Sequence, residues 1–396
     1  MLRRIWNGFL DIFQQADLVL LGLCSAATLY GILIISSAAH YMPAGGGKYV
    51  KVQALALLLG IVLYILLSSL NLSGLLKHWK WVAAFNVGFI LLLLTPLGIS
   101  VNNNRAWLGP QTIGKKLGIA FLKNFPLTLQ PAELVKITFI ILLAAQLSLL
   151  KEHKDLRRFS YVIQPAGHML FMVGLLYVVS KDAGSALVYV FIFLGMALAA
   201  GMALRWFALG GVGAAGAFAL LWKLNKIPDH IRGRILAVLD HSYDVRGVGW
   251  QQTRSLLAIG SGGLTGQGLY HGTQVQSASS NSLPERYNDF IFASIGEELG
   301  LLGCLLVILL LFGIVARCLF IARKAQTETE ALICVGMASM LMFQVVANIG
   351  MCLYVVPVIG LTLPFFSYGG TSIMTTFMAM GVVSGIKRRC APDWVR

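Results

Sequence analysis

The feature that most constrains this chain is a series of apolar runs, each long enough to cross a lipid bilayer. The runs cover residues 18–39, 52–70, 81–98, 131–150, 162–180, 185–202, 206–222, 299–321, 331–353 and 367–386. Helices of this length and polarity are typical of membrane spans. The sequence therefore predicts an all-α polytopic integral membrane protein with about ten transmembrane helices in a single domain, residues 1–396.

Composition excludes the main alternatives. The chain is 57% hydrophobic and 12% charged, which is more apolar than a soluble core requires. Its net charge of +15 fits anionic lipid headgroups and topology signals rather than nucleic acid. The first apolar run has a basic start, but no small-residue cleavage site follows Ala39, so it is interpreted as a retained helix. The six cysteines show neither metal-ligand nor disulfide spacing.

Lys and Arg are distributed unevenly between alternate loops. If the N-terminus is inside, the inside loops hold Arg3, Arg4, Lys77, Lys80, Lys151, Lys154, Arg157, Arg158, Arg205, Arg317, Arg323, Lys324, Lys387, Arg388 and Arg389. The short outside loops hold only Lys48, Lys51 and Lys181. This asymmetry predicts that both termini are cytoplasmic.

Two outside loops are longer than simple connectors. The first covers about residues 99–130 and contains Arg105 and Trp107. The second, between the seventh and eighth helices, covers about residues 223–298 and is the largest polar region of the chain. Long loops in compact proteins are usually functional or disordered.

The end of the second loop concentrates acidic residues next to an apolar run. The stretch Leu283–Gly300 holds a quarter of the 16 acids of the chain, together with one base: Glu285, Asp289, Glu297, Glu298 and Arg286. An acid at the mouth of a membrane cavity is costly and marks a candidate functional site. Alternatively, Asn288 and Asp289 cap a helix that begins at Phe290.

Two further segments combine charge with helix starts. The fourth run opens with Gln130 and Pro131, followed by Glu133 and Lys136. Pro and an acid are ordinary in a first helical turn, but Lys136 lies deeper. It either pairs locally with Glu133 or faces a polar cavity and meets an acid or a phosphate there. Asp182 is either a helix cap or a site residue.

A glycine-rich segment and a late proline-glycine segment are less specific. The first, at residues 250–273, contains AIGSGGLTGQGL and the candidate binding residue Ser261. Its backbone could bind an anion, or its glycines could allow a tight re-entrant turn. The second, LTLPFFSYGG at residues 361–370, indicates a broken helix that lines a cavity.

Taken together, these segments resemble the SEDS family (shape, elongation, division and sporulation). The matching pieces occur in the family's order: QPAELVK, the DAG turn, AIGSGGLTGQGL, HGTQ, LPERYNDFIFASIGEELG, NIGM and LPFFSYGG. The resemblance implies a ten-helix peptidoglycan glycosyltransferase of the bacterial cytoplasmic membrane that polymerises lipid II on the outer face. It also implies a class B penicillin-binding protein as partner, and it favours the RodA-like branch over the FtsW-like one.

The resemblance assigns roles position by position. Asp289 matches the family's proposed catalytic acid, Lys136 the lysine thought to pair with that acid, and Asp182 a further acid. Other motif positions with candidate substrate-binding roles are Gln130, Glu133, Glu285, Arg286 and Glu297. In the first long loop, Arg105 is displaced by one position from the family pattern that includes Trp107, and Ala132 and Asn288 replace the usual Ser and Thr.

The implied reaction fits these residues. A sugar hydroxyl attacks an anomeric carbon while undecaprenyl pyrophosphate leaves, so the attacker needs a base, for which Asp289 is the candidate. The leaving group needs cations, which Lys136, outside Arg and Lys residues, or a divalent metal (Mg²⁺ or Mn²⁺) could supply. A transporter of lipid-linked precursor (a flippase) is the alternative, because broken helices and buried charges also suit transport. A structural scaffold would leave Lys136 and Asp289 unexplained.

Overall fold

The structure is a computed structural model that describes residues 16–41, 46–70, 72–101, 104–109, 111–119, 128–153, 156, 158–243, 247, 249–277 and 283–390. Its elements in chain order are α2 (Leu18–Ala38), α3 (Gly46–Ser68), α4 (Leu72–Lys77), α5 (Trp79–Leu91), η1 (Leu92–Leu94), β1 (Gly98–Val101), β2 (Asn104–Leu108), α6 (Gln111–Leu117), α8 (Pro131–His153), α9 (Phe159–Ser180), α10 (Ala183–Ala199), α11 (Leu204–Lys223), α12 (Asp229–Leu239), α13 (Trp250–Gly262), α14 (Ile291–Lys324), α15 (Glu328–Cys352) and α16 (Gly370–Arg389). Arg3, Arg4, Lys154 and Arg157, predicted on the inside, lie outside the described residues.

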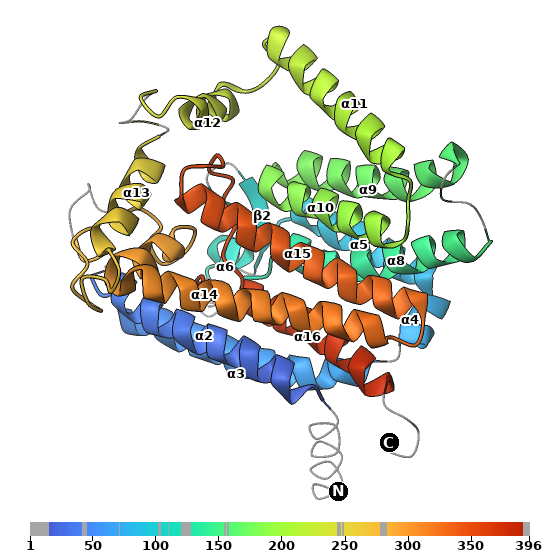
Figure 1. The fold of residues 1–396 in the computed structure, drawn as a ribbon, viewed down its shortest axis with the longest axis horizontal. Coiled ribbons are helices and arrows are strands. Elements are labelled where there is room, and N and C mark those ends of the chain that lie inside the picture. Colours follow the sequence, from blue (N-terminus) through green and yellow to red (C-terminus); the bar gives the residue numbers. More distant parts are fainter. Residues whose placement is uncertain are drawn as a thin grey trace, which may run out of the picture.

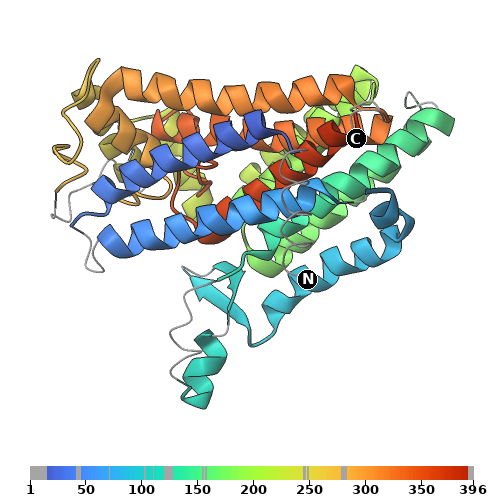
Figure 2. The ribbon, with the colours of Figure 1, turned by 90° about the horizontal axis from the view of Figure 1, so that it is seen from below.

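The predicted helical membrane fold is confirmed. Within the described ranges, seven helices are long and apolar enough to cross a membrane, and two shorter apolar helices, Trp79–Leu94 and Ala183–Ala199, run beside them. Figures 1 and 2 show most of these helices packed side by side as one elongated bundle, whereas α11, which has no buried residues, projects away from it in Figure 1. The total of ten spans stays a prediction.

The structure departs from the sequence-based expectation in two places. The first long loop contains a two-stranded antiparallel hairpin, in which Ile99 of β1 pairs with Trp107 of β2. The second long loop contains α12 and α13, and α14 begins at Ile291 rather than at residue 299. The first turns of α14 are buried against α13, and they carry charge only at Glu297 and Glu298, which a hydropathy pattern excludes from the span.

The contact between α3 and α16 depends on small residues. A Cβ placed on Gly381 of α16 would lie 2.6 Å from the carbonyl oxygen of Tyr64 in α3, which is inside van der Waals contact. Lipid is as apolar as the helix surfaces, so helix association in a membrane depends on such close packing. The absence of a side chain at Gly381 therefore sets the distance between these two helices.

A buried ion-pair cluster joins four helices at one end of the bundle, here called the Asp17 cluster. Asp17, which caps α2, has a fully buried side chain that accepts hydrogen bonds from Arg317 Nε (2.9 Å) and Nη2 (3.1 Å). Lys387 Nζ lies 3.3 Å from the same carboxylate, and Tyr64 donates its hydroxyl hydrogen to the Asp17 carbonyl at 2.8 Å. The start of α2 and the end of α16 therefore lie at the same end, which we call the terminal end.

The opposite end holds the glycine-rich segment, which folds against a kink in α14. Gly300 has non-helical angles (φ 64°, ψ −161°), and a Cβ there would meet Gly266 N at 2.4 Å. Backbone groups of Gln267 and Gly268 donate to the carbonyls of Glu297 and Glu298, each at 2.9 Å. Of the two interpretations of the glycine run, the structure shows the tight turn, because its backbone donors bind α14.

The α3–α16 contact gives a stability prediction. We expect Gly381→Ala to lower the melting temperature of the purified protein in mild detergent, because the new methyl group must displace the α3 backbone, at a cost of about 1–3 kcal/mol. The control is Gly174→Ala in α9, where a Cβ meets nothing within 4 Å. This variant should melt at or above the wild-type temperature, because Ala favours the helix. Equal melting temperatures for the two variants would contradict the packing argument.

Candidate active site

Lys136 is buried at the start of α8, where it forms a local ion pair. Its side chain is 1% exposed, and Nζ lies 2.7 Å from Glu133 Oε1, one helical turn earlier. A buried charge of this kind is costly unless it is paired. No ion pair within 4 Å joins Lys136 to Asp289 in the part of the chain that is described, so the expected Lys136–Asp289 pair is absent from this structure and the local alternative is present.

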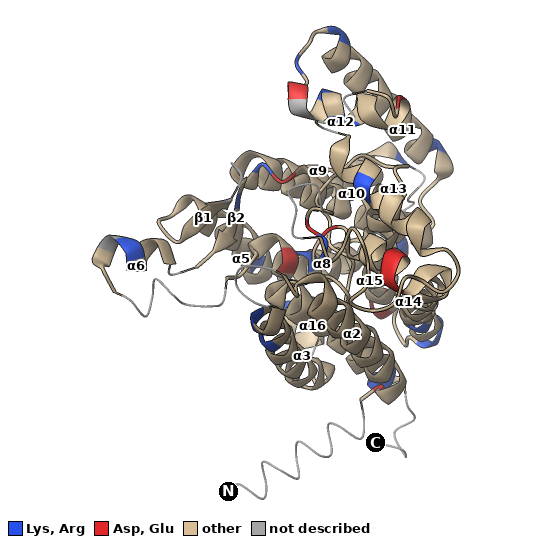
Figure 3. Cartoon of the chain, turned by 90° about the vertical axis from the view of Figure 1, so that its left-hand side faces the viewer, with Lys and Arg blue, Asp and Glu red and all other residues tan. Residues whose placement is uncertain are grey.

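Asp182 caps α10 and also joins α10 to α8. Its carboxylate accepts hydrogen bonds from Ser185 N at 3.0 Å, Ser185 Oγ at 2.7 Å and Gln130 Nε2 at 3.3 Å. Tyr189 of α10 donates to the Ala132 carbonyl at 2.8 Å. The starts of α8 and α10 are therefore fastened together, and Figure 3, which views the bundle from one end, shows acidic positions near the labels of α8 and α14.

Asp289 lies just before α14, and its position is fixed through the backbone. Asn348 Nδ2 of α15 donates to the Asp289 carbonyl at 2.8 Å. Ser367 Oγ donates to the Asn288 carbonyl at 2.7 Å, and Tyr368 N donates to the Tyr287 carbonyl at 2.9 Å. The acidic stretch, the NIGM segment and the LPFFSYGG segment therefore meet at one place, and Asp289 is where they meet.

The Asp289 carboxylate itself is not engaged in a cap. The N-cap position of α14 is Phe290, without a side-chain hydrogen bond, so the capping alternative for Asn288 and Asp289 is wrong. Asp289 is partly buried, and among the described residues none donates a hydrogen bond to its carboxylate. A carboxylate placed in this way is available to a ligand.

The surroundings of Asp289 favour its neutral form. Burial is the main cause that raises its pKa, from 3.8 to about 7, and the charges of Glu285 and Asp182 raise it further. The guanidinium of Arg234 in α12 opposes this shift. Arg234 Nη1 donates to the Val358 carbonyl at 2.8 Å, which holds it over the segment that leads to LPFFSYGG.

Arg234 is a candidate site residue that the sequence interpretation missed. The sequence shows Arg232 and Arg234 in the long polar loop. A charged loop does not indicate which of its arginine side chains points toward the site. The structure distinguishes the two. Arg232 donates to Asn225 and stacks on Trp222, away from Asp289, whereas Arg234 lies within electrostatic range of Asp289.

Several predicted site residues have structural contacts instead. Glu297 is fully buried and accepts hydrogen bonds from Thr273 Oγ1, Gln274 N and Val275 N at 2.7–2.9 Å. Arg286 is also buried and donates to the carbonyls of Ala38 and Ser277, both at 2.9 Å. These two side chains hold the glycine-rich segment and the end of α2 around the site.

The remaining predicted residues lie at its margins. Ser261 is exposed, and its hydroxyl donates to the Ala258 carbonyl of its own helix at 2.8 Å. Arg105, on the strand β2 that also carries Trp107, donates from Nη2 to the carbonyl of Thr95 at the end of η1, at 2.9 Å. Glu285 is exposed and has a left-handed backbone (φ 46°). Among these residues, Glu285 alone contributes to the electrostatics of Asp289.

The site has acids but no group of metal ligands. Among the described residues, no set of three or more His, Cys, Asp or Glu side chains could hold a metal ion. Cys24, Cys304, Cys318, Cys334 and Cys352 are free thiols buried in the apolar core. The carboxylates at this end therefore do not fit a metal centre held by the protein alone, and the expected divalent cation stays a prediction.

Fold and site together define a polytopic helical membrane protein with a carboxylate site at one end of its bundle. The FtsW/RodA/SpoVE family model, described as a cell cycle protein, matches residues 17–391, and the chain belongs to this family. It is 31% identical over 384 residues to a probable peptidoglycan glycosyltransferase FtsW of Geobacter metallireducens, covering 95% of this chain and 96% of the relative. It is also 31% identical over 385 residues to the stage V sporulation protein E of Bacillus subtilis, covering 94% and 97%.

A solved structure shows the same fold. A chain from a peptidoglycan synthase complex, described as coordinating polymerization and crosslinking, superposes with a TM-score of 0.76 at 29% identity, covering 96% of this chain and 99% of that one. The RodA structure of Thermus thermophilus superposes with a TM-score of 0.64 at 28% identity, covering 96% and 98%. The helical architecture is therefore shared along almost the whole chain.

The raised pKa of Asp289 gives a prediction that needs no substrate. Ionisation of a carboxyl whose folded pKa exceeds its unfolded value costs stability, so the native state loses stability as the pH rises from about 4 to 7. Asp289→Asn, which stays neutral, should therefore melt a few degrees above the wild type at a pH above 7. The difference should vanish near pH 4, where both side chains are neutral. If Asp289→Asn is less stable than the wild type at neutral pH, the inference that its surroundings raise the pKa of Asp289 is wrong.

Proposed function

We propose that this chain is a peptidoglycan glycosyltransferase that polymerises lipid II into glycan strands at the outer face of the bacterial cytoplasmic membrane. The observation that carries the proposal is the position of Asp289. It is a partly buried carboxyl at one end of the bundle, uncapped and fixed through its backbone by segments from α15 and the LPFFSYGG segment. The membership of the family and the names of the relatives supply the reaction class.

In the proposed reaction Asp289 acts as general base. It accepts the proton of the attacking sugar hydroxyl as the oxygen forms a bond to the anomeric carbon of the second substrate molecule. The bond from that carbon to the pyrophosphate oxygen breaks, and undecaprenyl pyrophosphate leaves with the electron pair. One displacement inverts the anomeric centre, so no second carboxylate is needed as a nucleophile. A base with a pKa near 7 is well matched to this task at neutral pH.

Two cations are candidates for binding the pyrophosphate. Arg234 is the cationic residue whose charge lowers the pKa of Asp289. Its guanidinium can bind phosphate oxygens in bidentate geometry. Lys136 is paired with Glu133, so a phosphate would have to compete with that carboxylate for Nζ. A divalent cation would need ligands from the pyrophosphate in addition to protein carboxylates, and we assign no step to it.

The orientation is proposed from the charge distribution, and the partner from a similar solved complex. The terminal end holds the ion pairs Asp17–Arg317, Glu330–Arg389 and Glu328–Lys151, whose bases were predicted on the inside. The excess of basic residues supports a cytoplasmic location for this end, with Asp289 on the outer side. A class B penicillin-binding protein is the proposed partner, since a similar chain belongs to a complex that couples polymerization to crosslinking.

The test of this function uses purified lipid II in proteoliposomes with three proteins: wild type, Asp289→Asn and Asp229→Asn, each assayed with and without a class B penicillin-binding protein. Loss of the base should reduce polymer formation by about 10²–10⁴-fold, the usual contribution of general base catalysis. Asp229, an exposed acid in the first turn of α12, is the matched control and should leave the rate unchanged. Polymer formation by Asp289→Asn at the wild-type rate would refute the assignment.

The same vesicles separate polymerase from transporter. In the transporter alternative, labelled lipid II crosses the membrane and no glycan strand forms under any condition. Polymer that depends on Asp289, without transfer of lipid II between leaflets, is the result that we expect. The acids of the site lie at one end of the bundle, whereas alternating access requires a binding site near the middle of the membrane.

Arg234 gives a prediction for the pH dependence. The base must be ionised, so kcat/KM should rise with pH through the pKa of Asp289, near 7. Because Arg234 lowers this pKa, Arg234→Gln should move the rise to higher pH, in addition to any loss of phosphate binding. Arg232→Gln, which removes a charge from the same helix but away from Asp289, is the control. A pH profile of Arg234→Gln that coincides with that of the wild type would contradict the predicted electrostatic role.

A further inference from the structure

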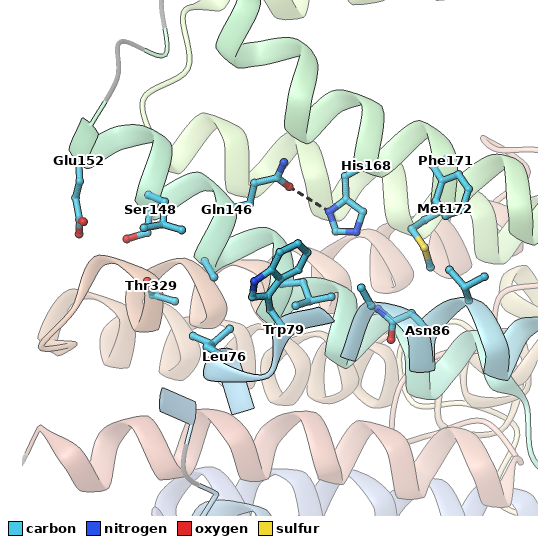
Figure 4. Close-up of a pocket in the computed structure, with 15 residues that line it drawn as sticks. Leu76, Trp79, Asn86, Gln146, Ser148, Glu152, His168, Phe171, Met172 and Thr329 are labelled. Atoms are coloured by element: carbon cyan, nitrogen blue, oxygen red, sulfur yellow. Dashed lines mark hydrogen bonds between the residues drawn. The ribbon is translucent and has the colours of Figure 1, made fainter. Parts of the chain in front are cut away.

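A cavity of about 670 Å³ lies among α4, α5, α8 and α9 (Figure 4). Its walls are mainly apolar, and its lining includes Glu152 near the C-terminal end of α8 and Thr329 at the start of α15. Both positions belong to the terminal end. The cavity has the size of pockets that hold small molecules, which occupy roughly 300–1,000 Å³. None of the predicted site residues lines it.

One polar group in the cavity has an unused hydrogen-bond donor. Asn86 of α5 is 1% exposed, and its Nδ2 atom has no hydrogen-bond partner. Its Oδ1 atom is used, because it accepts from Thr138 Oγ1 of α8. A buried amide without a partner costs about 1–3 kcal/mol, so Asn86 needs an acceptor that the protein does not supply.

The second polar group, His168, already has a hydrogen-bond partner in the cavity wall. His168 Nδ1 of α9 lies 3.2 Å from Gln146 Oε1 of α8, and Figure 4 shows this pair on the cavity wall opposite Asn86. Gln146 Oε1 is an acceptor, so His168 Nδ1 carries the hydrogen. The Asn86 donor is therefore the group that points to a ligand, and the ligand must present an acceptor oxygen within otherwise apolar surroundings.

The lining of the cavity includes exposed apolar side chains. Trp79, Leu149 and Phe171 line it and are 55%, 60% and 56% exposed, so an apolar chain from outside can contact the lining. The exposed basic residues Lys77 and Lys80 flank Trp79 in the chain, and basic side chains beside membrane helices attract lipid phosphate groups. Asn86 follows Trp79 by seven residues, which places it about 10 Å deeper along α5.

We propose that this cavity binds a membrane phospholipid of the leaflet at the terminal end. One acyl chain fills the apolar space, its ester carbonyl accepts the hydrogen bond from Asn86 Nδ2, and its phosphate lies near Lys77 and Lys80. Water fits the cavity poorly, because a buried water molecule needs 2–4 polar partners and the walls are mostly apolar. The proposal does not depend on the reaction at Asp289, since the two places lie at different ends.

The experiment places the full chain in nanodiscs of phosphatidylethanolamine and phosphatidylglycerol that contain a trace of phospholipid with a diazirine in its acyl chain. After irradiation, crosslinked peptides are mapped by mass spectrometry. We expect crosslinks on the cavity faces of α5, α8 and α9 in the wild type. Ala83→Trp, which fills the cavity, should lose them, whereas Ala84→Trp, the neighbouring exposed position that does not line the cavity, should keep them.

A second variant tests the donor. Asn86→Leu keeps the volume and removes Nδ2, and Thr138 can then donate its hydroxyl hydrogen to the Val135 carbonyl, which lies 3.1 Å from Oγ1. Labelling should fall about fivefold, the effect of one lost neutral hydrogen bond. This variant also decides the matter if Ala83→Trp does not fold. Equal labelling of Ala83→Trp and Ala84→Trp, or of Asn86→Leu and the wild type, would overturn the proposal.

Discussion

The partly buried carboxyl of Asp289 is held in place by its backbone, and this constraint organises the end of the bundle where it lies. Asn348 and the segment around Ser367 bind the carbonyls of Asn288 and Asp289, so the side chain is positioned without being consumed by a cap or an ion pair. Glu297 and Arg286 hold the surrounding loops through their own buried contacts. Glu297 and Arg286 thus hold the structure of the site together, whereas the carboxylate of Asp289 remains available for chemistry.

A comparison of Asp17 with Asp289 shows how the same residue type serves two purposes. Burial raises the pKa of Asp17, but the hydrogen bonds from Arg317 and the charge of Lys387 outweigh it, and the pKa is lowered. Asp289 has burial and two neighbouring acids, with Arg234 alone opposing them, and its pKa is raised to about 7. The first acid is a permanent anion that fastens helices together, and the second can exchange a proton at neutral pH.

The sequence predicted the helices well, because hydrophobic length is a local property that lipid imposes on each span. The order of the motifs along the sequence, which resembles that of the family, also indicated that the segments around Asp289 belong to one site. It did not predict the partner of Lys136, since Glu133 and a distant acid were both compatible with the pattern. Nor did it single out Arg234 or the Asn86 cavity, because the direction of a side chain depends on packing between helices that are distant in the chain.

The most direct measurement is the titration of Asp289 itself, by infrared difference spectroscopy of the wild type and Asp289→Asn in membranes between about pH 4 and pH 9. The carbonyl stretch of a protonated carboxyl should be present at low pH, disappear with a midpoint near 7 and be absent from the variant. Such a band would show that this site keeps a base ready at neutral pH. A carboxylate that is already ionised at pH 5 would contradict the environment from which the proposed catalytic role is argued.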